Sequence, residues 1–171
     1  MMPTADELPT GWKLGGAKSS GWRDAAPAID EGGLLTCGAQ PLEAAERRSG
    51  PYQLVLSAGN EGGGDGAGFT LGQNNEQQAR QNLALTRKLL NCRQPRNAGI
   101  GDESLVFTTE RFTHVMLRVG GIESRIHAPK EGQSPSAEAW AKVMEQRIRS
   151  VLAGEQPTAR IAAGQASGSS R

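Results

Sequence analysis

Aromatic residues and long apolar runs are scarce in this chain. Three Trp, one Tyr and three Phe are the only aromatic residues among 171, and hydrophobic residues make up 36% of the sequence. No apolar stretch approaches the roughly 18 residues that a membrane-spanning helix requires. The 23 glycines indicate many loops. We therefore expect one domain with a modest hydrophobic core.

Neither sign of charge is in excess. The 19 Lys and Arg residues balance 18 Asp and Glu residues, which leaves a net charge of +1, and no long block of like charge occurs. Such a chain lacks the basic surface that nucleic acids or anionic lipids attract, so we expect neither as a partner. Residues 1–7 also lack the basic and apolar regions of a secretion signal. We expect membrane contact only through a signal or anchor that this sequence does not include.

Catalytic motifs are missing as well. The sequence has no GxSxG elbow, HExxH pair, Walker loop or dinucleotide fingerprint. The glycine-rich stretch at 59–68 follows a predicted strand but lacks the Gly-Lys-Ser/Thr ending of a phosphate loop, so we interpret it as a flexible loop. We predict that the chain is not an enzyme and that it has no catalytic residues, no cofactor and no metal site.

The chain has only two cysteines, Cys37 and Cys92, which are too far apart for a CxxC redox or zinc motif. A bridge between them would stabilise the fold by roughly 4 kcal/mol in the chain-entropy model. Two buried free thiols are the alternative, and a cytosolic protein would favour that state. A disulfide would therefore indicate an oxidising, extracytoplasmic compartment, and two free thiols would indicate the cytosol.

The N-terminal third is rich in Gly, Pro, Ala and Ser, and residues 6–35 show no sustained period. Trp12 and Trp22 lie in this segment. We favour the interpretation that both rings anchor the segment to the core, and the alternative is that they line a ligand groove. A short helix is predicted at 42–48 and a strand at 52–57.

A longer helix is predicted from Asn74 or Asn75 to about residue 91, because apolar residues recur at helical spacing. Leu89 and Cys92 share the apolar side, which predicts that Cys92 faces inward.

A last helix is predicted after Ser134, which would cap it, with Pro135 in the first turn and Gly154 at its end. Residues 155–171 are rich in Ala, Gly, Ser and Gln, which predicts a disordered tail.

The strongest local pattern predicts strands at 104–109, 112–119 and 122–128, with a two-residue turn at Gly120-Gly121 in which both glycines have positive φ. The turn fixes the register of the last two strands. One face is then apolar and should be buried, and it carries Val115, Leu117, Val119, Ile122 and Ile126. The other face should be exposed to water, and it carries His114, Met116 and Arg118 opposite His127, Arg125 and Glu123.

Three features of this hairpin are candidate sites. His114 and His127 are predicted to be cross-strand neighbours, close enough to share a metal ion. We favour the interpretation that both are solvated, because a metal site would need further ligands. Arg118 and Glu123 are predicted to form an exposed ion pair without a function. The adjacent carboxylates at 102 and 103 are predicted to point to opposite faces, which makes them a poor catalytic pair.

Several segments resemble an actinobacterial sensor-domain family that is similar to the extracellular domain of PknH-type receptor kinases and occurs in surface lipoproteins. The resemblance covers about residues 4–154. It lies in Leu8-Pro9-Thr10-Gly11-Trp12, in the two cysteines, in Gly99-Ile100-Gly101-Asp102-Glu103-Ser104, and in a strand that closes with Arg118-Val119-Gly120.

This resemblance implies an antiparallel sheet flanked by helices, a cleft for an unknown small ligand, an extracytoplasmic location and no activity. It also implies a bridge between Cys37 and Cys92, whereas the second disulfide of the kinase domain cannot form here. We therefore expect one α+β domain at residues 1–154, with a disordered tail at 155–171. Its expected function is extracytoplasmic binding or sensing of an unknown ligand. The alternative is a cell-surface interaction domain whose outer hairpin face docks a protein partner.

Overall fold

A computed structural model describes residues 1–14, 23–24, 52–60, 66–130 and 135–161. Trp22, Cys37, the predicted helix at 42–48 and residues 162–171 lie outside the described residues. The elements are η1 (Ala5–Glu7), β1 (Trp12–Leu14), β2 (Arg23–Asp24), β3 (Tyr52–Asn60), β4 (Ala67–Gln73), α2 (Glu76–Leu89), η3 (Asn91–Arg93), β5 (Glu103–Thr108), β6 (Phe112–Val119), β7 (Ile122–Pro129) and α3 (Ala137–Leu152).

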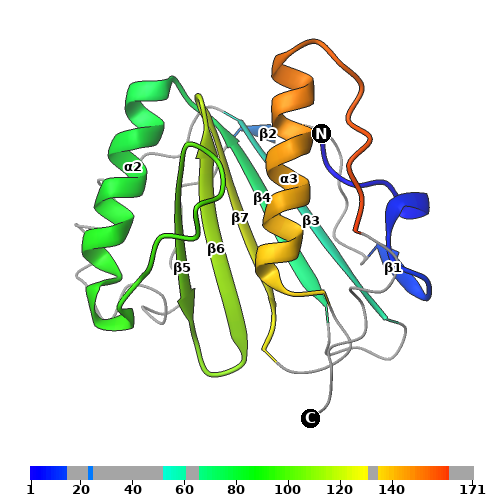
Figure 1. The fold of residues 1–171 in the computed structure, drawn as a ribbon, viewed down its shortest axis with the longest axis horizontal. Helices are drawn as coiled ribbons and strands as arrows, with labels where there is room; N and C mark the ends of the chain where they lie inside the picture. The colour runs from blue at the N-terminus through cyan, green and yellow to red at the C-terminus, as the bar shows by residue number, and fades with distance from the viewer. Residues whose placement is uncertain (15–22, 25–51, 61–65, 131–134, 162–171) are drawn as a thin grey trace.

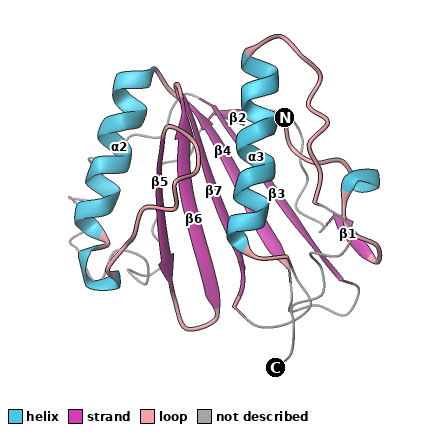
Figure 2. Ribbon diagram, in the orientation of Figure 1, coloured by secondary structure: helices cyan, strands magenta, loops and turns pink. Residues whose placement is uncertain are grey.

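The described strands form one seven-stranded sheet in the order β1-β3-β4-β7-β6-β5, and β2 also pairs with β3. Every pairing is antiparallel. Figure 1 shows α3 lying across the near face of the sheet and α2 beside β5, and Figure 2 shows the same arrangement by element type. The predicted α+β class, with an antiparallel sheet flanked by helices, is confirmed.

The register of the β6–β7 hairpin is the one that the sequence predicts. His114 lies opposite His127, and Arg118 lies opposite Glu123. The turn differs in one respect, because only Gly120 has a positive φ, of 56°. Gly121 is needed for a different reason: a Cβ there would lie 2.2 Å from the carbonyl oxygen of Asn74.

Helix α3 packs on the apolar face of this hairpin. Trp140 is buried, with its ring centroid 5.1 Å from that of Phe69 and 5.8 Å from that of Trp12. Burial of one such large side chain stabilises a fold by roughly 2–3 kcal/mol. The predicted core positions of the hairpin are all buried here, namely Val115, Leu117, Val119, Ile122 and Ile126.

Helix α2 covers the opposite face, where we expected water. Neighbouring residues on a strand point to opposite faces, so Met116 lies on the other side of the sheet from Val115. Five buried residues of α2, its C-terminal cap, β5 and β6 form a second apolar cluster, namely Leu83, Leu90, Leu105, Phe107 and Met116. The molecule therefore has three layers, with one helix on each side of the sheet.

The predicted exposure of this second face is wrong. Arg118 is only 4% exposed and His114 only 5%, while Glu123 and Arg125 are partly buried. Alternation along a hairpin separates its two faces, but it does not reveal whether a distant helix covers the more polar one. The apolar side of α2 needs a partner surface, and β5 with β6 provides it.

Segments from both ends of the described chain lie against α3. Arg147 is 2% exposed, and its guanidinium donates to the carbonyl oxygens of Met1 at 2.8 Å, Met2 at 3.0 Å and Ala159 at 3.0 Å. Ile161 packs against the core. We expected disorder from residue 155 onward, but Ala159 and Ile161, in the described part of that segment, make these contacts.

The helix ends correct three further expectations. Asn75, one of the two predicted caps of α2, accepts from the Gln78 amide at 2.8 Å, which confirms that prediction. Ser136, rather than the predicted Ser134, caps α3. Helix α2 ends at Leu89, and the chain continues into the η3 turn. Cys92 lies in that turn and is exposed, so its predicted inward position is wrong. The helical spacing used to place it does not extend past the end of the helix.

Candidate functional site

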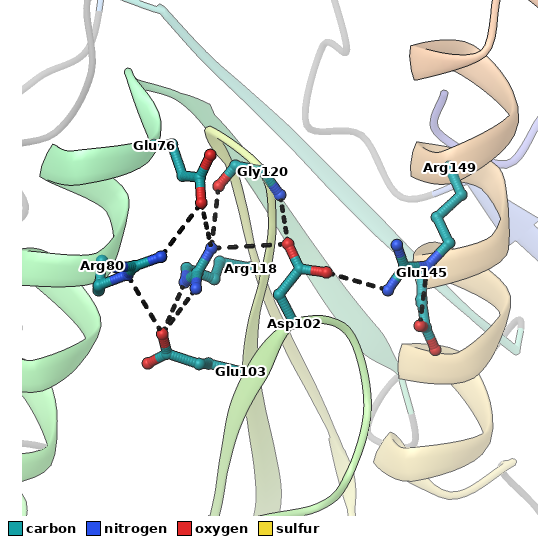
Figure 3. A network of polar contacts seen from close by, with 8 residues as sticks. All are labelled: Glu76, Arg80, Asp102, Glu103, Arg118, Gly120, Glu145 and Arg149. Atoms are coloured by element: carbon teal, nitrogen blue, oxygen red, sulfur yellow. Dashed lines mark hydrogen bonds and ion pairs between the residues drawn. The ribbon is translucent and has the colours of Figure 1, made fainter.

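Apart from buried Arg147 and its partner Glu7, two groups of described side chains combine charge with burial. The first, the Arg118 network, lies at the Gly120-Gly121 turn and contains Glu76, Arg80, Asp102, Glu103, Arg118, Gly120, Glu145 and Arg149 (Figure 3). The second, the histidine cluster, lies toward the other end of the same strands and contains Arg93, Phe107, Phe112, His114, Arg125 and His127.

Arg118 is the centre of the first group. Its guanidinium donates to Glu103 Oε1 from Nη2 at 2.6 Å and from Nε at 3.1 Å. Its Nη1 lies 3.5 Å from Asp102 and 3.8 Å from Glu76. Glu103 is the direct cross-strand partner of Arg118, and Glu76 comes from the first turn of α2. Three carboxylates, two at the start of β5 and one from α2, therefore surround one buried cation.

Asp102 extends this network to the other helix. Its Oδ2 accepts from the Gly120 amide at 2.7 Å, and its Oδ1 accepts from Arg149 of α3 at 3.1 Å. The Gly120 amide is the main cause of a lowered Asp102 pKa, which Arg149 and Arg118 lower further against the opposing effect of burial. Figure 3 shows the resulting chain of contacts from α2 past the hairpin turn to α3.

This arrangement corrects two expectations about the hairpin. Asp102 and Glu103 were predicted to diverge, yet both contact Arg118, because Asp102 precedes β5 and is not on its alternating pleat. The expected Arg118–Glu123 pair is replaced by contacts between Arg118 and these carboxylates. Glu123 instead accepts from the side-chain amides of Asn74 at 2.8 Å and Asn82 at 2.7 Å.

The chemistry of the Arg118 network suits structure better than catalysis. Four carboxylates alternate with three guanidinium groups, and every one of these seven side chains is in an ion pair within the network. The network joins α2 and α3 across the end of the sheet, which is a structural role.

His114 is the centre of the second group. Its ring stacks on Phe107, with centroids 4.8 Å apart and planes 6° apart, and Phe112 approaches edge-on at 6.2 Å. His114 Nε2 lies 3.2 Å from the Thr109 hydroxyl, and its buried Nδ1 has no hydrogen-bond partner. The prediction of two solvated histidines is therefore wrong for His114.

The surroundings of His114 keep its imidazole neutral. Burial is the largest cause of a pKa lowered to about 3, and the positive charges of Arg125, His127 and Arg93 lower it further. A base this weak does not remove protons from a substrate near neutral pH.

His127 lies beside His114, with ring centroids 5.8 Å apart, and its ring occupies the space above Gly68 of β4. A Cβ at Gly68 would lie 2.1 Å from His127 Cε1, so the missing side chain of Gly68 makes room for this ring. Among the described residues, no group of three or more His, Cys, Asp or Glu side chains is arranged to hold a metal ion.

The structure describes only some of the tryptophans and cysteines that the sequence analysis named as site residues. Trp12 is 8% exposed and packs on Trp140, as the anchoring interpretation predicts, while Trp22 lies outside the described part of the chain. Cys92 is not a free thiol. Its predicted partner Cys37 is not described, so the pairing of the two stays a prediction.

Sequence reasoning missed the burial of Arg118 and His114. A signal was present on the strand that pairs with β6. Leu105 and Phe107 of β5 lie opposite Met116 and His114, which places two large apolar residues on the face that we expected to be wet. A face with those residues needs a cover.

No protein-family model, no curated protein and no solved structure matches this chain. Within the described ranges, no helix has the length and apolar character needed to span a bilayer.

Proposed function

We propose that this chain is a non-catalytic binding or sensory domain that works outside the cytoplasm. The observation that carries the proposal is the state of its reactive side chains. Arg118, Asp102 and Glu103 hold one another, and His114 is buried between aromatic rings with its pKa lowered to about 3. In the described residues, these charged and titratable side chains are thus used for structure.

The extracytoplasmic part of the proposal depends on the cysteines and on the resemblance to the sensor-domain family. Cys92 lies in an exposed turn and is not a free thiol. An exposed disulfide persists in an oxidising compartment and is reduced in most cytosols. The oxidised state of Cys92 therefore supports export.

The alternative of a docking surface on the outer hairpin face has less support. That face lies under α2 at β5 and β6, where His114, Met116 and Arg118 are all buried. A protein partner would have to displace α2 from its apolar cluster in order to reach them.

A ligand screen combined with activity assays tests this function. We would measure thermal shifts of the oxidised protein against a library of small metabolites, and assay ester, peptide, phosphate and glycoside hydrolysis with the same preparation. We expect at least one saturable stabilising ligand and no turnover. Turnover that co-purifies with the protein and disappears in His114→Phe would overturn the proposal, and so would the absence of any stabilising ligand.

A further inference from the structure

We propose that Arg147 of α3 couples two segments of the chain, the first segment at residues 1–8 and the second segment at residues 155–161, so that they dock on the helix and leave it together while the sheet stays folded. This inference goes beyond the proposed function and does not depend on it.

The first argument is where the contacts of the Arg147 guanidinium go. A guanidinium carries five N–H donors. Nε donates to the Met1 carbonyl oxygen at 2.8 Å, and Nη2 donates to that of Met2 at 3.0 Å. Nη1 donates to Glu7 Oε1 and to the Ala159 carbonyl oxygen, both at 3.0 Å, and Nη2 also lies 3.0 Å from Glu7 Oε2. These contacts all go to the two segments and none of them goes to the sheet.

The second argument is that one nitrogen serves both segments. Nη1 of Arg147 donates to Glu7 of the first segment and to Ala159 of the second. Arg147 is only 2% exposed, so these partners take the place of water around its charge. If one segment left, water would reach the guanidinium and weaken its hydrogen bonds to the other segment, while any donor that stayed covered would lose its acceptor. The state with only one segment docked is therefore disfavoured.

The third argument is that both segments lie outside the main framework of the fold. The first contains only the short turn η1, and the second contains no helix or strand. Figure 1 shows the chain after α3 turning back beside this helix toward the first segment. Four apolar side chains of the segments pack against the core and are only partly buried, namely Met1, Met2, Leu8 and Ile161. Segments of this kind open locally before the core of a domain unfolds.

Methyl NMR tests the coupling, because reporters lie on both segments and in the core. Met1 and Met2 report on the first segment and Ile161 on the second, while buried Met116 belongs to the other apolar cluster and reports on the fold. With carbon-13 labels on these methyl groups, the parent would be titrated with urea. The signals of both segments should move to random-coil positions over the same range of urea, below the range in which the Met116 signal moves.

The variant Ile161→Asp separates coupling from simple loss of contacts. It places a charge where an apolar side chain packs against the core, so it should release the second segment while Arg147 stays intact. Amide signals of residues 155–160 should then take random-coil positions. We expect the released population of the first segment, measured at Met1 and Met2, to rise about tenfold as well. The Met116 signal should not move.

Two further variants test the role of the guanidinium. Arg147→Met keeps a long unbranched side chain without donors and should release both segments. Arg149→Met is the matched control, because Arg149 lies on the same helix, is 50% exposed in its side chain, and pairs with Glu145 and Asp102 instead of with either segment. Both segments should stay docked in this control.

Two results would overturn the proposal. If residues 155–160 were released in Ile161→Asp while Met1 and Met2 kept their docked positions, the segments would dock independently. Equal effects of Arg147→Met and Arg149→Met on both segments would show that the guanidinium does not hold them. The Ile161→Asp experiment decides the question even if Arg147→Met does not fold.

Discussion

The guanidinium of Arg118 lies 2.6 Å from the carboxylate of Glu103, its direct cross-strand partner, although Arg118 is only 4% exposed. A buried cation is expensive unless charge and hydrogen bonds compensate it. Asp102 and Glu76 supply further negative charge from the loop before β5 and from α2. The contact therefore does more than pair two strands, because it also connects them to the start of a helix.

Replacement of Arg118 by methionine should destabilise the domain by about 2–4 kcal/mol. The substitution removes the buried cation that compensates the negative charges of Glu76, Asp102 and Glu103. Arg80→Met is the matched control. Arg80 is 61% exposed in its side chain and pairs with two of the same carboxylates, Glu76 and Glu103, so its loss should cost less than about 1 kcal/mol. Urea denaturation at pH 7 measures both. If both variants lost the same free energy of unfolding, the ion pairs of buried Arg118 would be no stronger than those of exposed Arg80.

The hairpin register could be predicted from the sequence because it depends on local features. Two alternating strands and a Gly-Gly turn allow one pairing that buries Val115 and Leu117 together, and the structure has that pairing. The position of α2 could not be predicted in this way. It depends on packing between residues such as Leu83 and Met116, which are 33 positions apart, and no alternation within the hairpin encodes it.

The candidate site was predicted only in part for the same reason. The cross-strand proximity of His114 and His127 follows from register, whereas the environment of His114 does not. Phe107 arrives from β5 and Arg93 from the turn after α2, and these neighbours turn an expected solvated histidine into a buried neutral one. Tertiary contacts of this kind set the chemistry of a residue after its place in the sheet is fixed.

Two glycines of β4 provide a test of the histidine cluster. At Gly68 a Cβ would lie 2.1 Å from His127 Cε1, whereas at Gly72 it would meet nothing within 4 Å. Gly68→Ala should force the His127 ring away and cost about 1–3 kcal/mol, the usual range for overpacking. Gly72→Ala should stay within about 0.5 kcal/mol of the parent or stabilise it slightly.

Chemical denaturation together with the imidazole NMR signals would compare the two glycine variants. The His127 resonance should move strongly in Gly68→Ala and little in Gly72→Ala. If both substitutions were tolerated equally and His127 did not move, the ring would not depend on the space above Gly68.

The contact between Glu7 and Arg147 predicts a pH dependence of stability. Burial alone would raise the Glu7 pKa, but hydrogen bonds from Arg147 and Thr4 outweigh it and lower the pKa from 4.5 to about 2. A carboxylate with a pKa lower in the folded than in the unfolded state stabilises the fold above pH 4.5, and this stabilisation disappears as the pH falls toward 2.

Glu7→Gln should therefore destabilise the domain at pH 7, and the difference from the parent should shrink steadily between pH 4.5 and pH 2. Glu110→Gln, which removes an exposed carboxylate, is the control and should show little difference at any pH. Thermal denaturation at a series of pH values measures both. A Glu7→Gln deficit that is the same at pH 3 and pH 7 would mean that the charge of Glu7 is not what Arg147 binds.

The last prediction concerns the bridge on which the proposed location depends. Cys92 lies in the η3 turn directly after α2, is exposed and is not a free thiol, and Cys37 is the only other cysteine in the sequence. A bridge between these two residues would tie the end of α2 to the N-terminal third of the chain. It would close a long loop, so its loss should cost roughly 2–5 kcal/mol.

Mass spectrometry of a non-reduced digest should find the peptide pair that contains Cys37 and Cys92, and a melting curve with reductant should show a lower midpoint. The double substitution Cys37→Ser with Cys92→Ser is the control, since its midpoint should match that of the reduced parent and should not respond to reductant. An unchanged midpoint of the parent after complete reduction would show that the bridge does not stabilise the fold. The argument for an oxidising compartment would then lose its physical basis, because an exposed Cys92 without a stabilising bond gives the protein no reason to require export.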